Sequence, residues 1–340
     1  MANIHPTLTS LFEDIADAIR NSSPITEKIK ADVFPAYIRM LDYTGDIPET
    51  PSILDSCSWD FIRWASDEGI ADLIWNIGDR KKITFSGAIG GFVNFNLSPC
   101  VYIIGFNHNE DIEGKNRIHF GTFFTDLTGG TDITLVDTYY NNNIYTDGSK
   151  LFNFNHWGNY NYGGWKGCDL RYDILGSTKT APSGYGSSVN TNRQGYDAND
   201  STATSPKSGT FMAALPSDLR AVMKSIKKFS DNYGDKGRPT EESISESVDY
   251  LPLLSEYEVY GSRNYANTYE KNYQKQYDYY RNGNSKVKYR YDAEETSAVY
   301  TLRSVSASYS NRICASSRDG LRSGYIDASS SRGLSPIICV

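Results

Sequence analysis

Apolar residues recur with helical spacing at the start of the chain. Leu8, Leu11, Ile15 and Ile19 are separated by three or four residues, and the acidic residues of this segment fall between them. This spacing predicts an amphipathic helix over residues 8–20 with one narrow apolar stripe. A helix this short is only marginally stable alone in water, so the stripe implies a partner surface.

A second amphipathic piece follows a break at residues 22–24. Ile29 resumes the apolar spacing, and a further short helix is predicted with Pro35 in its first turn and with Ile38 and Leu41 on its buried side. Two interpretations stay open at this point. The pieces form either a helical hairpin packed on the chain's own domain or an attachment surface for another protein.

The pattern changes after these helices. Residues 45–56 contain two prolines and read as a linker. Beyond the linker, residues 59–65 and 215–228 have helical spacing, whereas residues 82–85 and 101–106 have the apolar content of strands. The sequence therefore predicts a helical module at 1–44, a linker, and a larger domain that occupies the rest of the chain.

Tyrosine, serine, asparagine and glycine dominate much of the second half. Residues 139–196 have few periodic apolar positions, which predicts long ordered loops, and 12 of the 26 tyrosines fall between Tyr250 and Tyr300. Tyrosine rings give stiff contact area and short polar side chains give hydrogen bonds, a combination typical of recognition surfaces. Core packing is the plainer role of any single tyrosine. The expected ligand-binding residues are Trp157, Tyr160, Tyr162, Tyr309, Asn311, Arg312, Arg318, Arg322 and Tyr325.

Charge is distributed unevenly. The chain carries a net charge of −7, yet residues 281–340 hold nine Arg or Lys against five Asp or Glu, a local excess of +4. The planar guanidinium suits carboxylates, phosphates and acidic sugars, so this segment favours an anionic partner, although solvated arginines would also explain it. The acidity of the whole chain argues against nucleic-acid binding. No stretch approaches the ~20 apolar residues of a membrane span.

Candidates for catalysis are few. The five cysteines are scattered, and only Cys168, next to Asp169 and twelve positions after His156, suggests a nucleophile, a grouping that often arises by chance. The turn at residues 231–237 could hold calcium but lacks the bidentate acid of a known loop. The adjacent carboxylates at 241–242 would diverge rather than act together. We therefore expect no enzymatic activity, no cofactor and no metal.

The N-terminal segment resembles a known module. Residues 15–20, Ile25 and residues 28–38 closely resemble the N-terminal module of many tailed-phage structural proteins, and the resemblance covers about residues 1–44. It implies a virion component that is held to other phage proteins through this module. The implied attachment residues are Leu8, Leu11, Ile15, Ile19, Ile29 and Ile38.

The larger domain contains an ordered set of short motifs: Trp75, 77–79, 103–108, 164–165 with 170–171, 215–219, 253–261, Tyr273 with Tyr277, 302–304 and 333–336. Through these motifs, residues 57–340 resemble an uncharacterised domain family of phage and bacterial surface proteins related to the C-type-lectin-like fold. The resemblance implies an α+β domain with a small twisted antiparallel sheet, flanking helices and long loops. The sequence departs from it at residues 300–304, where relatives carry two tryptophans, and at Ser335, where they usually carry arginine.

Together the two resemblances imply a phage virion protein made in the host cytoplasm. The expected role is a tail-fibre or receptor-binding component that recognises a host surface glycan or protein, as a homo-oligomer, with a trimer as the first expectation. The absence of a secretory leader in the first residues fits synthesis in a cytoplasm. A head-decoration or baseplate protein without a receptor role is the alternative, followed by a glycan-acting enzyme.

Overall fold

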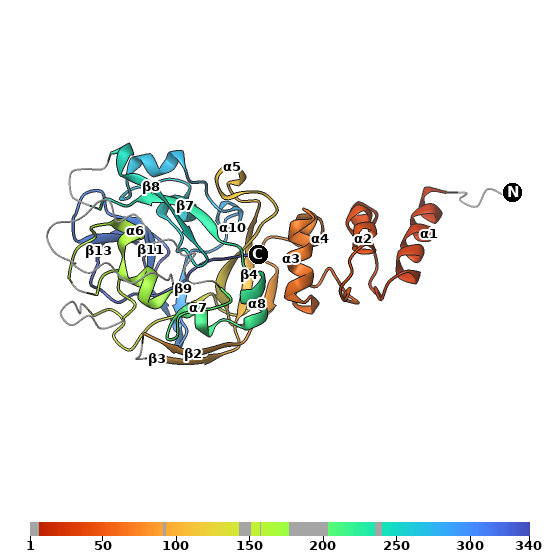
Figure 1. The fold of residues 1–340 in the computed structure, drawn as a ribbon, viewed down its shortest axis with the longest axis horizontal. Helices are drawn as coiled ribbons and strands as arrows, with labels where there is room; N and C mark the ends of the chain where they lie inside the picture. Colours follow the sequence, from red (N-terminus) through yellow and green to blue (C-terminus); the bar gives the residue numbers. More distant parts are fainter. Residues whose placement is uncertain (1–6, 91–92, 143–150, 157, 177–202, 235–239) are drawn as a thin grey trace.

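The N-terminal segment folds into short helices that lead away from the rest of the molecule in a row, with α1 (Leu8–Asn21) outermost (Figure 1). The computed structural model describes residues 7–90, 93–142, 151–156, 158–176, 203–234 and 240–340. The helix predicted over residues 8–20 is confirmed. It begins where the Thr7 hydroxyl accepts a hydrogen bond from the backbone N–H of Ser10 (3.1 Å).

Aromatic contacts join each helix of the row to the next. The rings of Phe12 in α1 and Phe34 in α2 (Phe34–Met40) lie 5.8 Å apart. Tyr43, which follows α2, lies 4.8 Å from Trp64 in α3 (Trp59–Asp67). These ring contacts fix the spacing of the row because aromatic rings bury much area in a defined geometry.

The buried side of α2 differs from the predicted one. Ile38 is 51% exposed and Leu41 is 38% exposed, so placing them on the buried side was wrong. Phe34, Tyr37 and Met40 are buried instead. Each helical residue advances about 100° around the axis. Because Phe34, Tyr37 and Met40 face the neighbouring helices, Ile38 lies about 100° away from that side and faces solvent.

Residues 45–56 are hydrogen-bonded to the segment that follows α1 and to the residue that follows α4 (Ala71–Ile74). The N–H of Thr26 donates to the carbonyl of Glu49 (2.8 Å), and the indole N–H of Trp75 donates to the carbonyl of Pro51 (2.9 Å). Leu54 within this segment is buried. The segment between the two predicted modules therefore has a defined path against both.

The largest sheet has four antiparallel strands in the order β1-β4-β5-β14. α3 packs against it through Trp59, whose ring lies 5.6 Å from that of Phe120 in β5. Every residue of β5 is buried, so both faces of this strand are covered. The strand bounds are β1 (Arg80–Lys82), β4 (Cys100–Phe106), β5 (Ile118–Phe124) and β14 (Ile338–Cys339).

Four smaller sheets complete the body: β10-β9-β6, β11-β12-β13, β2-β3 and β7-β8. All their pairings are antiparallel except that of β6 with β9. Their bounds are β2 (Phe85–Ile89), β3 (Val93–Leu97), β6 (Ile133–Thr134), β7 (Ile226–Asp231), β8 (Ile244–Asp249), β9 (Lys288–Arg290), β10 (Ala293–Ala298), β11 (Tyr300–Val305), β12 (Arg312–Ser316) and β13 (Arg322–Asp327).

Short helical pieces connect these sheets. The α-helices are α4 (Ala71–Ile74), α5 (Glu110–Glu113), α6 (Gly164–Gly167), α7 (Phe211–Ala214), α8 (Ser217–Val222), α9 (Glu256–Tyr260) and α10 (Asp278–Arg281). Tighter or wider turns occur at η1 (Ala31–Val33), η2 (Leu54–Ser56), the π-helical η3 (Leu170–Ile174), η5 (Glu241–Ser243) and η6 (Thr268–Asn272). Helices and several small, mainly antiparallel sheets confirm the expected α+β class.

The helix predicted over residues 215–228 is wrong in its second half. α8 ends at Val222, and β7 begins at Ile226, where it pairs with Asp249 of β8. Side-chain and backbone pairing with a distant strand outweighs the helical spacing of this segment. None of the helices in the described part of the chain combines the length and apolar character that crossing a membrane requires.

Gly164 holds the start of α6 against the end of β7, and it is predicted to be irreplaceable. Its φ is +51°, and a Cβ there would lie 1.9 Å from the carbonyl oxygen of Asp231. Gly129 has a similar φ of +66° but open space around it. We expect Gly164→Ala to lower the free energy of unfolding by more than about 3 kcal/mol, and Gly129→Ala by about 1 kcal/mol, measured by chemical denaturation. Equal losses would contradict this.

Candidate ligand-binding surface

A bulge in β13 brings two of the predicted binding residues to one face. Ile313 pairs with Ile326 and Ala315 with Ser323, so two residues of β13 lie opposite the single residue between them in β12. One of the two is Tyr325. The extra residue shifts the alternation of side chains, which lets Arg322 and Tyr325 face the same side although they are three positions apart.

Tyr325 lies at the centre of a group that we call the tyrosine patch, formed by Tyr265, Tyr309, Arg312 and Tyr325. The Tyr325 ring lies 5.4 Å from the ring of Tyr265 and 5.8 Å from that of Tyr309. The Arg312 guanidinium lies 5.1 Å from the Tyr309 ring and 5.4 Å from the Tyr325 ring. Tyr309 is 39% and Tyr325 53% exposed. The patch therefore offers aromatic faces and a cation to solvent.

The loop before α6 is hydrogen-bonded to the backbone of the patch. The buried side-chain amide of Asn161 donates to the carbonyls of Tyr309 (2.8 Å) and Arg312 (2.6 Å). The neighbouring rings of Tyr160 and Tyr162 are half-buried and stack at 5.6 Å. Both predicted loop tyrosines therefore lie beside the C-terminal binding residues.

The other predicted residues are spread more widely. The amide of Asn311 donates to Asp327 at 3.4 Å, next to the patch, whereas Arg318 is exposed in the turn between β12 and β13. Arg322 lies near that turn, with its guanidinium 4.7 Å from the Tyr260 ring. Trp157 lies outside the described residues. The structure thus places the predicted residues at two ends of one hairpin.

Sequence reasoning missed the residues that connect these two ends. Tyr260 and Tyr265 belong to α9 and the loop after it, and Tyr265 packs where a Cβ on Gly324 would lie 2.2 Å from its ring. The tyrosine-rich composition of residues 250–300 was a signal for them. It could not separate surface tyrosines from core ones such as Tyr277 and Tyr280, which are buried.

The predicted attachment residues divide by position along the helical row. Ile19 and Ile29 are buried inside it, and Leu11 and Ile15 are half-buried. Leu8 is 66% exposed near the outer end of α1, and Ile38 is exposed on α2. Phe12, 37% exposed, lies one helical turn from Leu8. The outer end of α1 therefore carries an apolar surface that the row itself leaves uncovered.

A buried charge cluster occupies the centre of the body. The ammonium of Lys228 in β7 lies 2.7 Å from Glu113 of α5 and 2.8 Å from Glu258 of α9. The guanidinium of Arg303 in β11 lies 3.0 Å from Glu258. His108 stacks on Tyr277 beside them, with ring centroids 3.6 Å apart. We call Glu113, Lys228, Glu258 and Arg303 the charge cluster.

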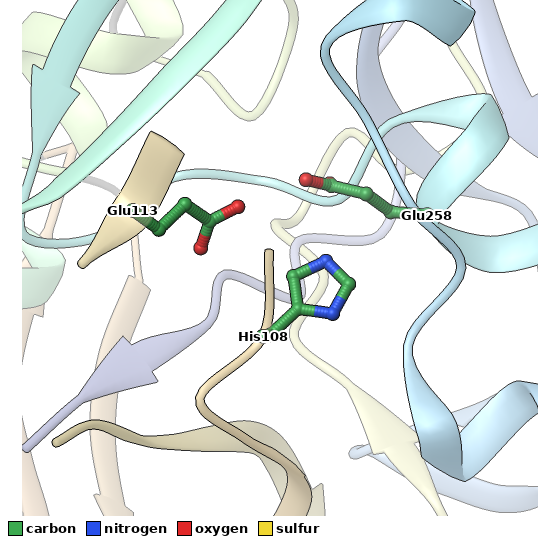
Figure 2. Close-up of side chains that lie close together, drawn as sticks. All are labelled: His108, Glu113 and Glu258. Atoms are coloured by element: carbon green, nitrogen blue, oxygen red, sulfur yellow. The ribbon is translucent and has the colours of Figure 1, made fainter. Parts of the chain in front are cut away.

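Within the described residues, one group has the spacing of metal ligands: His108, Glu113 and Glu258, whose ligand atoms lie within 4.8 Å of one another. Figure 2 shows the two carboxylates approaching from opposite sides above the imidazole. The Lys228 ammonium already lies between the carboxylates. A metal ion would have to displace this cation, so the residues present fit an internal ion pair better than a metal site.

Burial and charge act against each other in this cluster. Burial raises the pKa of Glu113 above its usual value. For Glu258, burial also favours the protonated form, but Arg303 and Lys228 outweigh it and hold the pKa well below its usual value. Burial lowers the pKa of His108 and of His119, so both imidazoles stay neutral. The cluster is thus a structural centre around the Glu258 carboxylate.

Cys168 and His156, the candidate nucleophile and its neighbour, and the described part of the candidate calcium turn at residues 231–237 all make contacts within the fold. The Nε2 atom of His156 lies 3.0 Å from the carbonyl oxygen of Leu151. Burial raises the pKa of the Cys168 thiol. A buried thiol with a raised pKa is a poor nucleophile. In the turn, the Asp231 carboxylate accepts from the N–H groups of Tyr233 (3.0 Å) and Gly234 (3.2 Å); residues 235–239 lie outside the described residues.

The chain belongs to a family described as a domain of unknown function (DUF6273), whose family model matches residues 134–340. The matched region contains the whole tyrosine patch, the hairpin around Arg322, and the Lys228, Glu258 and Arg303 members of the charge cluster. No curated protein matches the chain, and no solved structure does either.

Lys228 is predicted to be essential for the fold. Lys228→Met leaves Glu113 unpaired in the interior, so we expect a loss of about 3–5 kcal/mol in the free energy of unfolding. The neighbouring Lys227 is 45% exposed and pairs with Glu246 at 3.3 Å on the surface, so Lys227→Met should change the same quantity by less than about 1 kcal/mol. Chemical denaturation measures both, and similar effects of the two variants would refute the central role of the cluster.

Glu270 predicts a pH dependence of stability. Burial raises the pKa of Glu270 to about 7, although hydrogen bonds from the Asp231 N–H (3.0 Å) and the Ser304 hydroxyl (2.7 Å) act in the opposite direction. A carboxyl with a raised pKa binds its proton more tightly in the folded chain. Its contribution to stability is therefore complete below its ordinary pKa of 4.5 and is lost as the pH rises through 7.

We therefore expect the wild-type chain to lose about 2 kcal/mol more stability than Glu270→Gln between pH 5 and pH 7.5, measured by urea denaturation at several pH values. Glu110→Gln, which changes an exposed carboxyl, is the control and should keep the wild-type slope. A Glu270→Gln slope equal to that of wild type would contradict the assignment.

Proposed function

We propose that this protein is a structural component of a tailed-phage particle, a tail-fibre or receptor-binding protein that recognises a host surface glycan or protein. The observation that carries the proposal is the separation of two surfaces. The uncovered apolar end of α1 lies at one extreme of the molecule, and β13, which carries Tyr325, lies at the far side of the body (Figure 1). Such an arrangement suits attachment at one end and recognition at the other.

The apolar end of α1 supports the attachment half of the proposal. Leu8 and Phe12 are exposed, and Leu11 and Ile15 are only half-buried against the chain itself. A contiguous exposed apolar surface on an amphipathic helix favours contact with another protein. Because residues 1–44 resemble phage attachment modules, we propose that this partner is another virion protein.

The tyrosine patch supports the recognition half. Aromatic faces suit the apolar faces of sugar rings, while Arg312 and the hydroxyl groups suit their polar edges. We extend the proposal to a C-type-lectin-like arrangement of the body, which the small antiparallel sheets and the long connections between them accommodate. Several copies on one particle, a trimer in the simplest case, would turn weak contacts into durable adsorption.

The proposal includes no catalytic step. Burial raises the pKa of the Cys57 thiol to about 12 and also raises the pKa of Cys314 and Cys339, which disfavours nucleophilic thiolates. Burial likewise holds His108 and His119 in their neutral form inside the core. The exposed chemistry of the patch is aromatic and cationic, which favours binding over acid–base catalysis.

Binding to host cells tests the proposal. We expect the labelled full-length chain to bind cells or wall polysaccharide of its host, and the double variant Tyr309→Ala/Tyr325→Ala to bind at least about tenfold more weakly, because truncation removes both exposed rings. Tyr139→Ala is the matched control, since Tyr139 is also 39% exposed but lies outside the patch. Fluorescence-based cell-binding isotherms give the affinities.

A second control tests the separation of the two surfaces. Leu8→Asp, which changes the most exposed apolar side chain of α1, should leave the binding of the purified chain to cells unchanged while it lowers the amount of protein incorporated into particles. If Tyr309→Ala/Tyr325→Ala leaves cell binding unchanged and the protein is located on the capsid, a head-decoration role would be favoured. Hydrolysis of the host glycan would favour an enzyme. Either result would overturn the receptor-binding proposal.

A further inference from the structure

A pocket opens at the end of the β12–β13 hairpin away from the tyrosine patch. Its volume is about 470 Å³, within the range of about 300–1,000 Å³ typical of small-molecule sites. We call it the Arg322 pocket. It is lined by Tyr260, Asn264, Lys286, Leu321 and Arg322.

The Tyr260 ring is a fixed wall of this pocket. Its hydroxyl lies 2.8 Å from the Ser316 hydroxyl of β12 and 3.1 Å from the carbonyl of Gly320. The next residue, Gly261, has a φ of +68°, so α9 ends there and the chain turns to supply Asn264. The wall is thus held by the helix on one side and by the hairpin on the other.

Two cations lie against this ring and line the same pocket. The guanidinium of Arg322 lies 4.7 Å and the ammonium of Lys286 lies 5.9 Å from the Tyr260 ring centroid. Within the described residues, Lys286 is half-buried and forms no ion pair. The Arg322 guanidinium donates to the Ser262 hydroxyl and to the Tyr260 carbonyl (3.4 Å), and its buried Nε lies 3.9 Å from Glu256. Lys286 therefore brings an unpaired cation to the pocket, and Arg322 brings a second cation that is held in place.

The nearest acid does not neutralise these cations. Glu256 lies 3.9 Å from Arg322, but its carboxylate accepts hydrogen bonds from the backbone N–H groups of Asn264 (2.8 Å) and Ala266 (2.8 Å). The residues that line the pocket include two cations and no carboxylate, and Glu256 beside Arg322 offsets only one of the two positive charges. An anion that enters the pocket would meet Lys286, Arg322 and the Asn264 amide together, which is the donor set that carboxylate and phosphate groups prefer.

The pocket and the tyrosine patch form one surface. Asn264 lines the pocket, and the adjacent Tyr265 packs on Tyr325 in the patch. Along β13, Arg322 and Tyr325 are three residues apart, or about 10 Å. A short oligosaccharide could therefore place a sugar ring on the patch and a charged substituent in the pocket.

We infer that the Arg322 pocket binds the carboxylate or phosphate group of an acidic sugar. This inference deepens the proposed function and rests on it for the source of the ligand, a host surface glycan. The chemistry of the pocket itself is independent of that source, because it follows from two cations, an amide and an aromatic wall around one cavity.

Titration of the full-length chain with three monosaccharides tests the inference directly. We expect glucuronic acid and glucose 6-phosphate to bind at least about tenfold more tightly than glucose, and the preference to shrink as salt is raised, measured by calorimetry or ligand-observed NMR. A preference for one acid identifies the carboxylate or the phosphate as the natural group. Equal binding of all three sugars would overturn the inference.

Matched variants locate the site. Lys286→Gln and Arg322→Gln should each weaken binding of the preferred acid about tenfold, and Arg322→Lys should restore part of it. Arg318→Gln is the control, because Arg318 is an exposed arginine of the same hairpin outside the pocket. An equal loss with Arg318→Gln would show a diffuse charge effect and contradict the inference. Lys286 is half-buried and forms no ion pair within the described residues, so its variant tests the pocket even if Arg322 variants unfold.

The inference and the proposed function fail in different ways. Arg322-dependent binding of acidic monosaccharides by a chain that does not bind host cells would refute the receptor role and leave the pocket established. Conversely, cell binding that requires Tyr309 and Tyr325 but tolerates Lys286→Gln and Arg322→Gln would refute the pocket and support the receptor role.

Discussion

The body of this protein depends on a single buried carboxylate, that of Glu258. It lies 2.8 Å from the Lys228 ammonium and 3.0 Å from the Arg303 guanidinium, and it also accepts a hydrogen bond from the Ser255 N–H (2.8 Å) that caps α9. One side chain thereby joins β7, β11 and the start of α9. Removing ions from water is costly, so such a centre is stable only when every partner is present. The consequence is that α9 has one allowed position relative to the β11-β12-β13 sheet.

That position determines both halves of the candidate surface. Glu258 points into the core, whereas Glu256 on the same helix binds the loop that follows it, accepting hydrogen bonds from the N–H groups of Tyr265 (3.1 Å) and Ala266 (2.8 Å). The loop then covers one face of the hairpin, with Tyr265 at Tyr325 and Tyr260 at Arg322. A surface held in this way loses little conformational entropy when a ligand binds, which favours affinity from few contacts.

The sequence predicts local features of this arrangement but not the long-range ones. Helical spacing correctly indicated α1. Composition named Tyr309, Arg312 and Tyr325 as separate binding residues, and the structure brings their side chains together. The apolar spacing of residues 215–228 wrongly placed Lys228 in a helix. No local sequence feature distinguishes a lysine that becomes buried in the core from one that stays in solvent. The β13 bulge and the pairing of Glu258 with Arg303, 45 residues later, arise only from the tertiary fold. The Arg322 pocket also could not be predicted from the sequence, because Tyr260, Lys286 and Arg322 come from separate segments that only the tertiary fold brings together.

The positive charge of the C-terminal segment shows how structure changes the meaning of a sequence average. Several of its cations are neutralised internally: Arg303 by Glu258, Lys288 by the buried Asp132, Arg281 by Asp278 and Arg290 by Asp292. These charges contribute to folding and are not available for a ligand. Lys286 differs because it forms no ion pair within the described residues, and it lines one cavity together with Arg322, whose Nε lies 3.9 Å from Glu256. An electrostatic attraction for anions that appears spread over sixty residues in the sequence is therefore carried, in the folded chain, by fewer cations, two of which line one pocket near the exposed tyrosines.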